Sequence, residues 1–167
     1  MAGDPPSFRY YRALQGRWRG SMMLVLRRPR AAQGGGVCSL LSRLFSPLQM
    51  DTTVDASAHI QRGEVLHTTR ISKAGVTLYQ AIETLTLAAN GRDVSIERRQ
   101  RVPFSPFYVR ETGKSRAEVD ADARRVRYEF ALLGGILRQL ATHEDDGSVQ
   151  LIQEAPFLRA EVRLRRL

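Results

Sequence analysis

The chain has 167 residues, 43% of them hydrophobic, and a formal net charge of +9. This length suits one domain with one core, and no apolar run reaches the roughly 20 residues that a membrane-spanning helix needs. The N-terminus lacks the basic and apolar regions of a signal peptide. A lone cysteine, Cys38, excludes an internal disulfide and a cysteine-cluster metal site. The sequence therefore predicts a single cytoplasmic domain over residues 1–167.

The positive charge is carried almost entirely by arginine. Only Lys73 and Lys114 are lysines, and many arginines occur in pairs along the chain, such as Arg27-Arg28. A phosphate-binding surface has use for both residue types, because lysine binds phosphate well as a point charge. We therefore interpret most of the charge as a solvated surface, and nucleic acid or another polyanion is the less favoured partner.

The N-terminal part predicts a short helix followed by a strand. Residues 8–15 form a helical turn that we expect to cap one end of the fold. From Trp18 onward, alternate residues share one apolar face, as in a strand with one buried side: Trp18, Gly20, Met22, Leu24 and Leu26. A tryptophan with a glycine two positions away on either side, at the start of such a strand, suggests a β-barrel that is plugged at one end.

A second helix is predicted over residues 37–46. After three glycines, the apolar residues Val37, Leu40, Leu41, Leu44 and Phe45 fall at helical spacing, and Pro47 ends the pattern. In a barrel this helix would lie over an open end. There it would either seal the core or move as a lid that admits a ligand, and the sequence favours the seal.

Strand-like alternation returns over residues 50–60, 126–132 and 158–164. Asn90-Gly91 and Asp146-Gly147 are strong hairpin signals, and Thr112-Gly113 is a weaker turn signal. Residues 76–87 change phase, which predicts a bulge or a barrel corner. The spacing predicts an all-β, antiparallel up-and-down barrel of about nine to ten short strands.

The chain combines four predicted features: a short helix, the sequence Gly16-Arg17-Trp18 at the start of the first strand, a helix after that strand and a run of antiparallel strands. In this combination the chain resembles the calycin superfamily. This superfamily comprises the lipocalins, the fatty-acid-binding proteins and lipocalin-like bacterial relatives. The resemblance implies a lipocalin-like barrel, and an arginine late in the barrel packed over Trp18 by a cation–π contact. Arg159, Arg163 and Arg165 are the candidates, and Arg163 is our choice for this plug.

The resemblance also bears on cofactors. The nitrobindin branch of the superfamily would bind haem through a histidine near the C-terminus, and no histidine follows His143. We therefore expect neither haem nor another cofactor.

Several polar residues continue the apolar phase of their strands. Arg98 follows Val94 and Ile96, and Arg138 lies between Ile136 and Leu140. A buried arginine needs an acidic partner, which a fatty acid or similar carboxylate ligand would supply. Alternatively, these arginines lie near strand ends and reach water with only the stem buried. The expected ligand-binding residues are Met22, Leu24, Tyr79, Arg98, Tyr128 and Arg138.

The three histidines show no metal-ligand spacing, so no metal site is expected. His59 falls on a polar strand face, His67 has an ambiguous phase, and His143 is expected in a surface hairpin. Phosphate-loop, dinucleotide and nucleophile-elbow motifs are not found. The favoured function is binding of a small apolar or amphipathic molecule. The alternative is an isomerase or lyase on the same scaffold that uses Tyr79, Tyr128 or His67 as acid or base. The sequence leaves a homodimer open.

Overall fold

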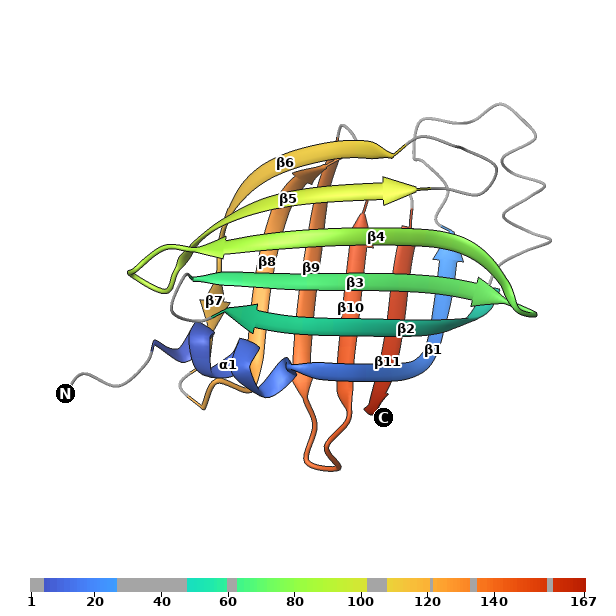
Figure 1. Cartoon of the computed structure of the whole chain (residues 1–167), viewed down its shortest axis with the longest axis horizontal. Coiled ribbons are helices and arrows are strands. Elements are labelled where there is room, and N and C mark those ends of the chain that lie inside the picture. Colours follow the sequence, from blue (N-terminus) through green and yellow to red (C-terminus); the bar gives the residue numbers. More distant parts are fainter. Residues whose placement is uncertain are drawn as a thin grey trace.

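The computed structural model describes residues 5–26, 48–59, 63–101, 108–120, 122–132, 135–155 and 158–167. Within these ranges, one helix and eleven strands follow one another, and Figure 1 shows their arrangement. Their bounds are α1 Pro6–Leu14, β1 Gly16–Leu26, β2 Leu48–His59, β3 Glu64–Lys73, β4 Val76–Leu87, β5 Asp93–Arg101, β6 Val109–Arg116, β7 Glu118–Val119, β8 Arg125–Leu132, β9 Gly135–His143, β10 Val149–Ala155 and β11 Leu158–Arg166.

All strands belong to one antiparallel sheet with the order β6-β5-β4-β3-β2-β1-β11-β10-β9-β8-β7. Consecutive strands are neighbours except β6 and β7, which lie at the two edges of the sheet, and the first strand pairs with the last. In Figure 1 the strands β2 to β5 cross in front of β8 to β11, so the sheet curls into a nearly closed barrel. The all-β, up-and-down barrel is confirmed, with eleven strands instead of nine or ten.

The barrel closes between β6 and β8 without a backbone ladder among the described residues. The backbone N–H of Glu129 on β8 donates to Ser115 Oγ on β6 at 3.2 Å. The chain itself crosses this seam, because β7 follows β6 after Ala117 and pairs with β8. A side-chain bond and chain continuity thus replace the ladder at the seam.

Both strong hairpin signals are confirmed. Gly91 and Gly147 have φ values of +66° and +76°, which side-chain-bearing residues rarely adopt. The amides of Arg92 and Asp93 donate to Asn90 Oδ1 at 2.9 and 3.0 Å and fix the first turn. The weaker signal at Thr112-Gly113 is wrong, because both residues lie inside β6.

The predicted bulge is confirmed in the hairpin of β3 and β4. The pairing register shifts between Ile71 and Ser72, which face Tyr79 and Thr77, so Leu78 is the extra residue. Beyond the bulge, Tyr79 and every second residue after it line the interior of the barrel. The local irregularity therefore decides which side chains of β4 face inward.

Helix α1 confirms the predicted N-terminal helix, and it lies across one end of the barrel (Figure 1). It buries Tyr10, Tyr11 and Leu14 against the core. Trp18 is 3% exposed, and its Nε1 donates to the carbonyl oxygen of Leu14 at 2.7 Å. This end of the barrel is closed by the helix and the indole together.

The helix expected over residues 37–46 lies outside the described residues, as does Cys38. Among the helices in the described ranges, none has the length and apolar character to cross a membrane.

Candidate ligand-binding site

The interior of the barrel contains a cavity of about 410 Å³. At the closed end it is lined by Tyr10, Tyr11 and Leu14 of α1. At the other end of the barrel it is lined by Leu24, near the end of β1, and by Leu158, at the start of β11. The inward-facing residues of the strands form its wall, since side chains alternate between the two faces of each strand. Its volume lies within the roughly 300–1,000 Å³ of small-molecule sites.

Two unlike walls enclose this cavity. The inner faces of β1, β10 and β11 are mostly apolar and include Met22, Leu24, Leu151, Leu158 and Val162. The opposite wall, on β3 to β5, carries the polar side chains of His67, Tyr79, Glu83, Arg98 and Gln100. A cavity of this kind can hold an apolar chain on one side and satisfy polar groups on the other.

The polar wall is organised around a buried ion pair. Arg98 and Glu83 face each other across β4 and β5, and Arg98 Nε donates to Glu83 Oε1 at 2.6 Å. The two side chains are only 9% and 16% exposed. On the neighbouring strands, His67 of β3 is the cross-strand neighbour of Glu83, and Glu111 of β6 is the cross-strand neighbour of Arg98. The charge of Arg98, which we expected to hold a ligand carboxylate, is therefore already balanced within the protein.

A chain of hydrogen bonds lies on the same wall, nearer the open end. Tyr79 Oη donates to Gln100 Oε1 at 3.0 Å, and Gln100 Nε2 donates to Glu111 Oε2 at 3.1 Å. Burial raises the pKa of Tyr79 to about 12, against the opposing effect of Arg98. Tyr79 is thus a neutral phenol whose hydrogen is already donated.

Nearer the closed end, Tyr10, Tyr11, His67 and Tyr128 form what we call the deep polar cluster. All four line the cavity, and the ring of Tyr11 lies 5.9 Å from that of His67 and 6.4 Å from that of Tyr128. The three hydroxyl groups and His67 Nε2 are buried, and none has a hydrogen-bond partner in the described part of the chain.

Three members of the deep polar cluster, His67, Tyr10 and Tyr128, are uncharged at neutral pH. Burial lowers the pKa of the His67 imidazole, only partly offset by Glu83, and it raises the pKa values of Tyr10 and Tyr128. Both effects have one cause, because burial penalises the charged form of each group. The cluster therefore presents neutral donors and acceptors to the cavity.

Of the residues expected to bind ligand, Met22, Leu24, Tyr79, Arg98 and Tyr128 all line the cavity. Arg138 does not, and its assignment is corrected. Its side chain is 58% exposed on the outer face and its Nε donates to Glu129 Oε1 at 3.0 Å. The neighbours that suggested an apolar phase, Ile136 and Leu140, are themselves exposed, because β9 faces inward through its odd-numbered residues.

The arginine over Trp18 is also corrected. Arg163 lies on the outer face, where its NH2 contacts Asp146 Oδ2 at 2.8 Å, and Arg159 contacts Glu154 and Glu161 instead. Arg166 lies over the indole, with its guanidinium carbon 5.9 Å from the ring centroid. The inward phase of β11 runs through its even-numbered residues, and it places Arg166 directly opposite Trp18.

Two further residues of the interior were missed or misplaced. Glu83 was missed, although the sequence contains a signal for it. Glu83 lies seven positions before Asn90 and Arg98 lies seven positions after Gly91. In a hairpin that turns at Asn90-Gly91, these two residues therefore face each other. The surface position expected for His143 is wrong. Its ring is half-buried, with its centroid 4.9 Å from that of Tyr10 and 6.3 Å from that of Trp18.

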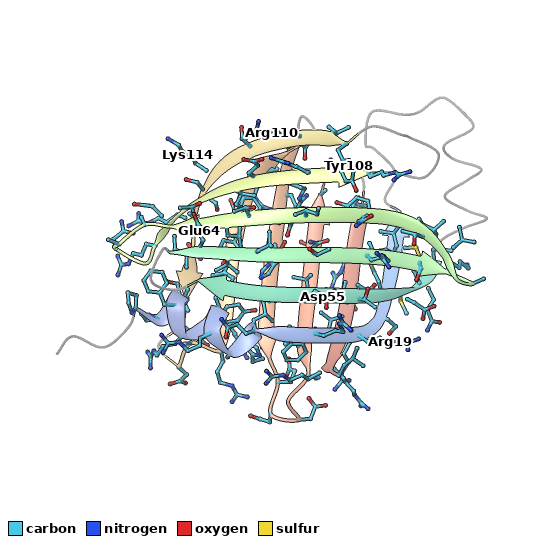
Figure 2. All side chains as sticks on the ribbon, viewed as in Figure 1. Arg19, Asp55, Glu64, Tyr108, Arg110 and Lys114 are labelled. Atoms are coloured by element: carbon cyan, nitrogen blue, oxygen red, sulfur yellow. The ribbon has the colours of Figure 1, made fainter. Side chains whose placement is uncertain are left out.

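The outer face carries most of the charge. Arg19, Asp55, Arg110 and Lys114 are exposed and project from the outside of the barrel (Figure 2). Many outward arginines contact carboxylates, as Arg17 does with Asp55 at 2.8 Å and Arg110 with Glu97 at 3.0 Å. This arrangement matches a solvated surface with interspersed signs.

Within the described ranges, no group of three or more His, Cys, Asp or Glu side chains is placed to hold a metal ion. Comparisons with protein-family models and with curated proteins find no match. The architecture, a nearly closed antiparallel barrel, is consistent with a calycin-like fold.

Proposed function

We propose that this protein binds a small amphipathic molecule inside its barrel, as a cytoplasmic member of the calycin superfamily. The observation that carries the proposal is the cavity of about 410 Å³ with one apolar and one polar wall. The apolar wall on β1, β10 and β11 suits a hydrocarbon portion, and each methylene buried there contributes about 0.8 kcal/mol. The polar wall and the deep polar cluster suit the polar end.

The test compares a variant that fills the cavity with one that changes only the outside. Ala81 is buried and lines the cavity, whereas Ser21 is exposed on the outer face of β1. We expect wild-type protein and Ser21→Phe to bind an environment-sensitive apolar fluorophore equally. Ala81→Phe should bind it at least about tenfold more weakly, which corresponds to about 1.4 kcal/mol. Equal binding by all three, or no binding by the wild type, would contradict the proposal.

A second candidate is a proton-transferring isomerase or lyase. It is favoured by one observation: His67 Nε2 and the Tyr128 hydroxyl are buried at the cavity and have no hydrogen-bond partner among the residues that the structure describes. These groups can serve as base and acid if a substrate lies between them. Incubation of ligand-loaded protein in D2O distinguishes the candidates. A binder returns its ligand unchanged in mass spectra, whereas proton transfer at carbon introduces deuterium.

A further inference from the structure

We infer that the ligand binds with a neutral oxygen, that of a hydroxyl, carbonyl or amide group, against the deep polar cluster, and that a carboxylate is disfavoured there. This inference rests on the proposed function and specifies the ligand class. It reverses the sequence-based expectation of a fatty acid. Three observations carry it: the unsatisfied groups, their neutrality and the charge balance beside them.

Several polar groups of the deep polar cluster are buried and unsatisfied. Tyr10, Tyr11 and Tyr128 are 1%, 2% and 2% exposed, and their hydroxyl groups have no partner in the described chain. Leaving a buried polar group unsatisfied costs about 1–3 kcal/mol, so several such groups around one cavity point to a bonding partner that enters from outside. Phenol and imidazole groups can both donate and accept, which matches a hydroxyl or carbonyl oxygen.

The charge balance disfavours an anionic partner at this position. The cluster itself contains no cation, because burial lowers the pKa of His67. Among the described residues that line the cavity, the guanidinium is that of Arg98. It is held by Glu83, which is the cross-strand neighbour of His67. A ligand carboxylate would be buried close to a like charge without a free counter-ion, which is costly.

A cationic head is disfavoured for a related reason. Among the described residues that line the cavity, the one carboxylate is that of Glu83, which is already paired with Arg98. Glu111 accepts a hydrogen bond from Gln100 farther toward the open end. An ammonium group at the phenols would therefore lose its hydration without gaining a free carboxylate. A neutral head avoids both penalties.

The experiment compares dodecanol, dodecanoic acid, dodecylamine and dodecane by displacement of the apolar fluorophore at pH 8. We expect dodecanol to bind about tenfold or more tightly than the acid and the amine, and more tightly than dodecane. Tyr128→Phe removes one hydroxyl and keeps the ring, so it should weaken dodecanol binding about 2- to 12-fold, the equivalent of about 0.5–1.5 kcal/mol. Tyr108→Phe, at an exposed tyrosine, is the matched control and should leave binding unchanged.

Glu83→Gln tests the charge argument in the opposite direction. It frees Arg98 from its partner, so dodecanoic acid should gain affinity relative to dodecanol. If this variant does not fold, the wild-type series and Tyr128→Phe still decide the question.

The outcomes separate this inference from the proposed function. Acid or amine binding as tightly as the alcohol, with no effect of Tyr128→Phe, overturns the inference and leaves the proposed function standing. Equal affinity for dodecanol and dodecane also overturns it, because the cluster then bonds only to water. If neither the fluorophore nor any of the four compounds binds, the proposed function fails as well.

Discussion

Replacing Glu83 tests the central feature of the interior, its buried ion pair. Glu83→Gln removes the carboxylate that faces Arg98, and both side chains are largely buried, at 16% and 9% exposed. Removing one partner of a buried pair leaves an uncompensated charge and costs about 3–5 kcal/mol. We expect a loss of about 3 kcal/mol, at the low end, because the amide oxygen of glutamine can still accept a hydrogen bond from Arg98.

The matched control is an ion pair with similar geometry on the surface. Arg17 Nε contacts Asp55 Oδ1 at 2.8 Å, but these side chains are 71% and 55% exposed. Water solvates both charges there, so such a pair contributes about 0–1 kcal/mol. Asp55→Asn should therefore cost less than about 1 kcal/mol. The comparison isolates burial, because both changes convert an acid into its amide.

The assay is urea-induced unfolding at 25 °C and constant pH, followed by circular dichroism. A change of midpoint at constant slope reports stability. Arg98→Met and the double variant Glu83→Gln/Arg98→Met complete a double-mutant cycle, in which the double variant should cost clearly less than the sum of the single changes. The reasoning is refuted if Glu83→Gln costs no more than Asp55→Asn, or if the two changes add to within about 0.5 kcal/mol.

Three further predictions concern the backbone, the plug and pH. Gly20→Ala should lower the free energy of unfolding, measured in urea, by at least about 1–3 kcal/mol, because the added methyl group would overlap the carbonyl oxygen of Arg163. A loss below this range would contradict the close approach of β1 and β11. Arg166→Gln should increase acrylamide quenching of the fluorescence of Trp18, the only tryptophan; Arg163→Gln should not, and the reverse result would restore the original assignment. Burial lowers the pKa of His67 from 6.5 in the folded state. The contribution of neutral His67 to folding stability is therefore complete above pH 6.5, and it is lost as the pH falls from 6.5 toward the folded-state pKa. His67→Gln should flatten the loss of stability between pH 7.5 and 5.5, and an unchanged pH profile would contradict this assignment.

The strand pattern was predictable because alternation depends only on which residues neighbour each other in sequence. The barrel, the Asn90-Gly91 turn and the bulge of β4 all follow from such local signals. Arg138 was misplaced for the same reason. Its exposed apolar neighbours, Ile136 and Leu140, imitate an inward phase, and only the pairing of β9 with β8 and β10 fixes the true one.

The site was less predictable because it joins elements that are distant in sequence. Tyr11 meets His67 and Tyr128 only after α1 has packed against the end of the barrel. No periodicity within α1 shows that both of its tyrosines will line the cavity. The pairing of Glu83 with Arg98, in contrast, was available from the turn that connects their strands.

The seam between β6 and β8 is the part of the barrel wall that lacks a backbone ladder among the described residues. Elsewhere around the wall, widening the circumference would break a ladder of main-chain bonds. At the seam, the bond from the Glu129 N–H to Ser115 Oγ joins the two strands in place of such a ladder. Segments held by few bonds open at the lowest free energy. We therefore expect the barrel wall to open at this seam when a larger ligand binds, while the fold is retained.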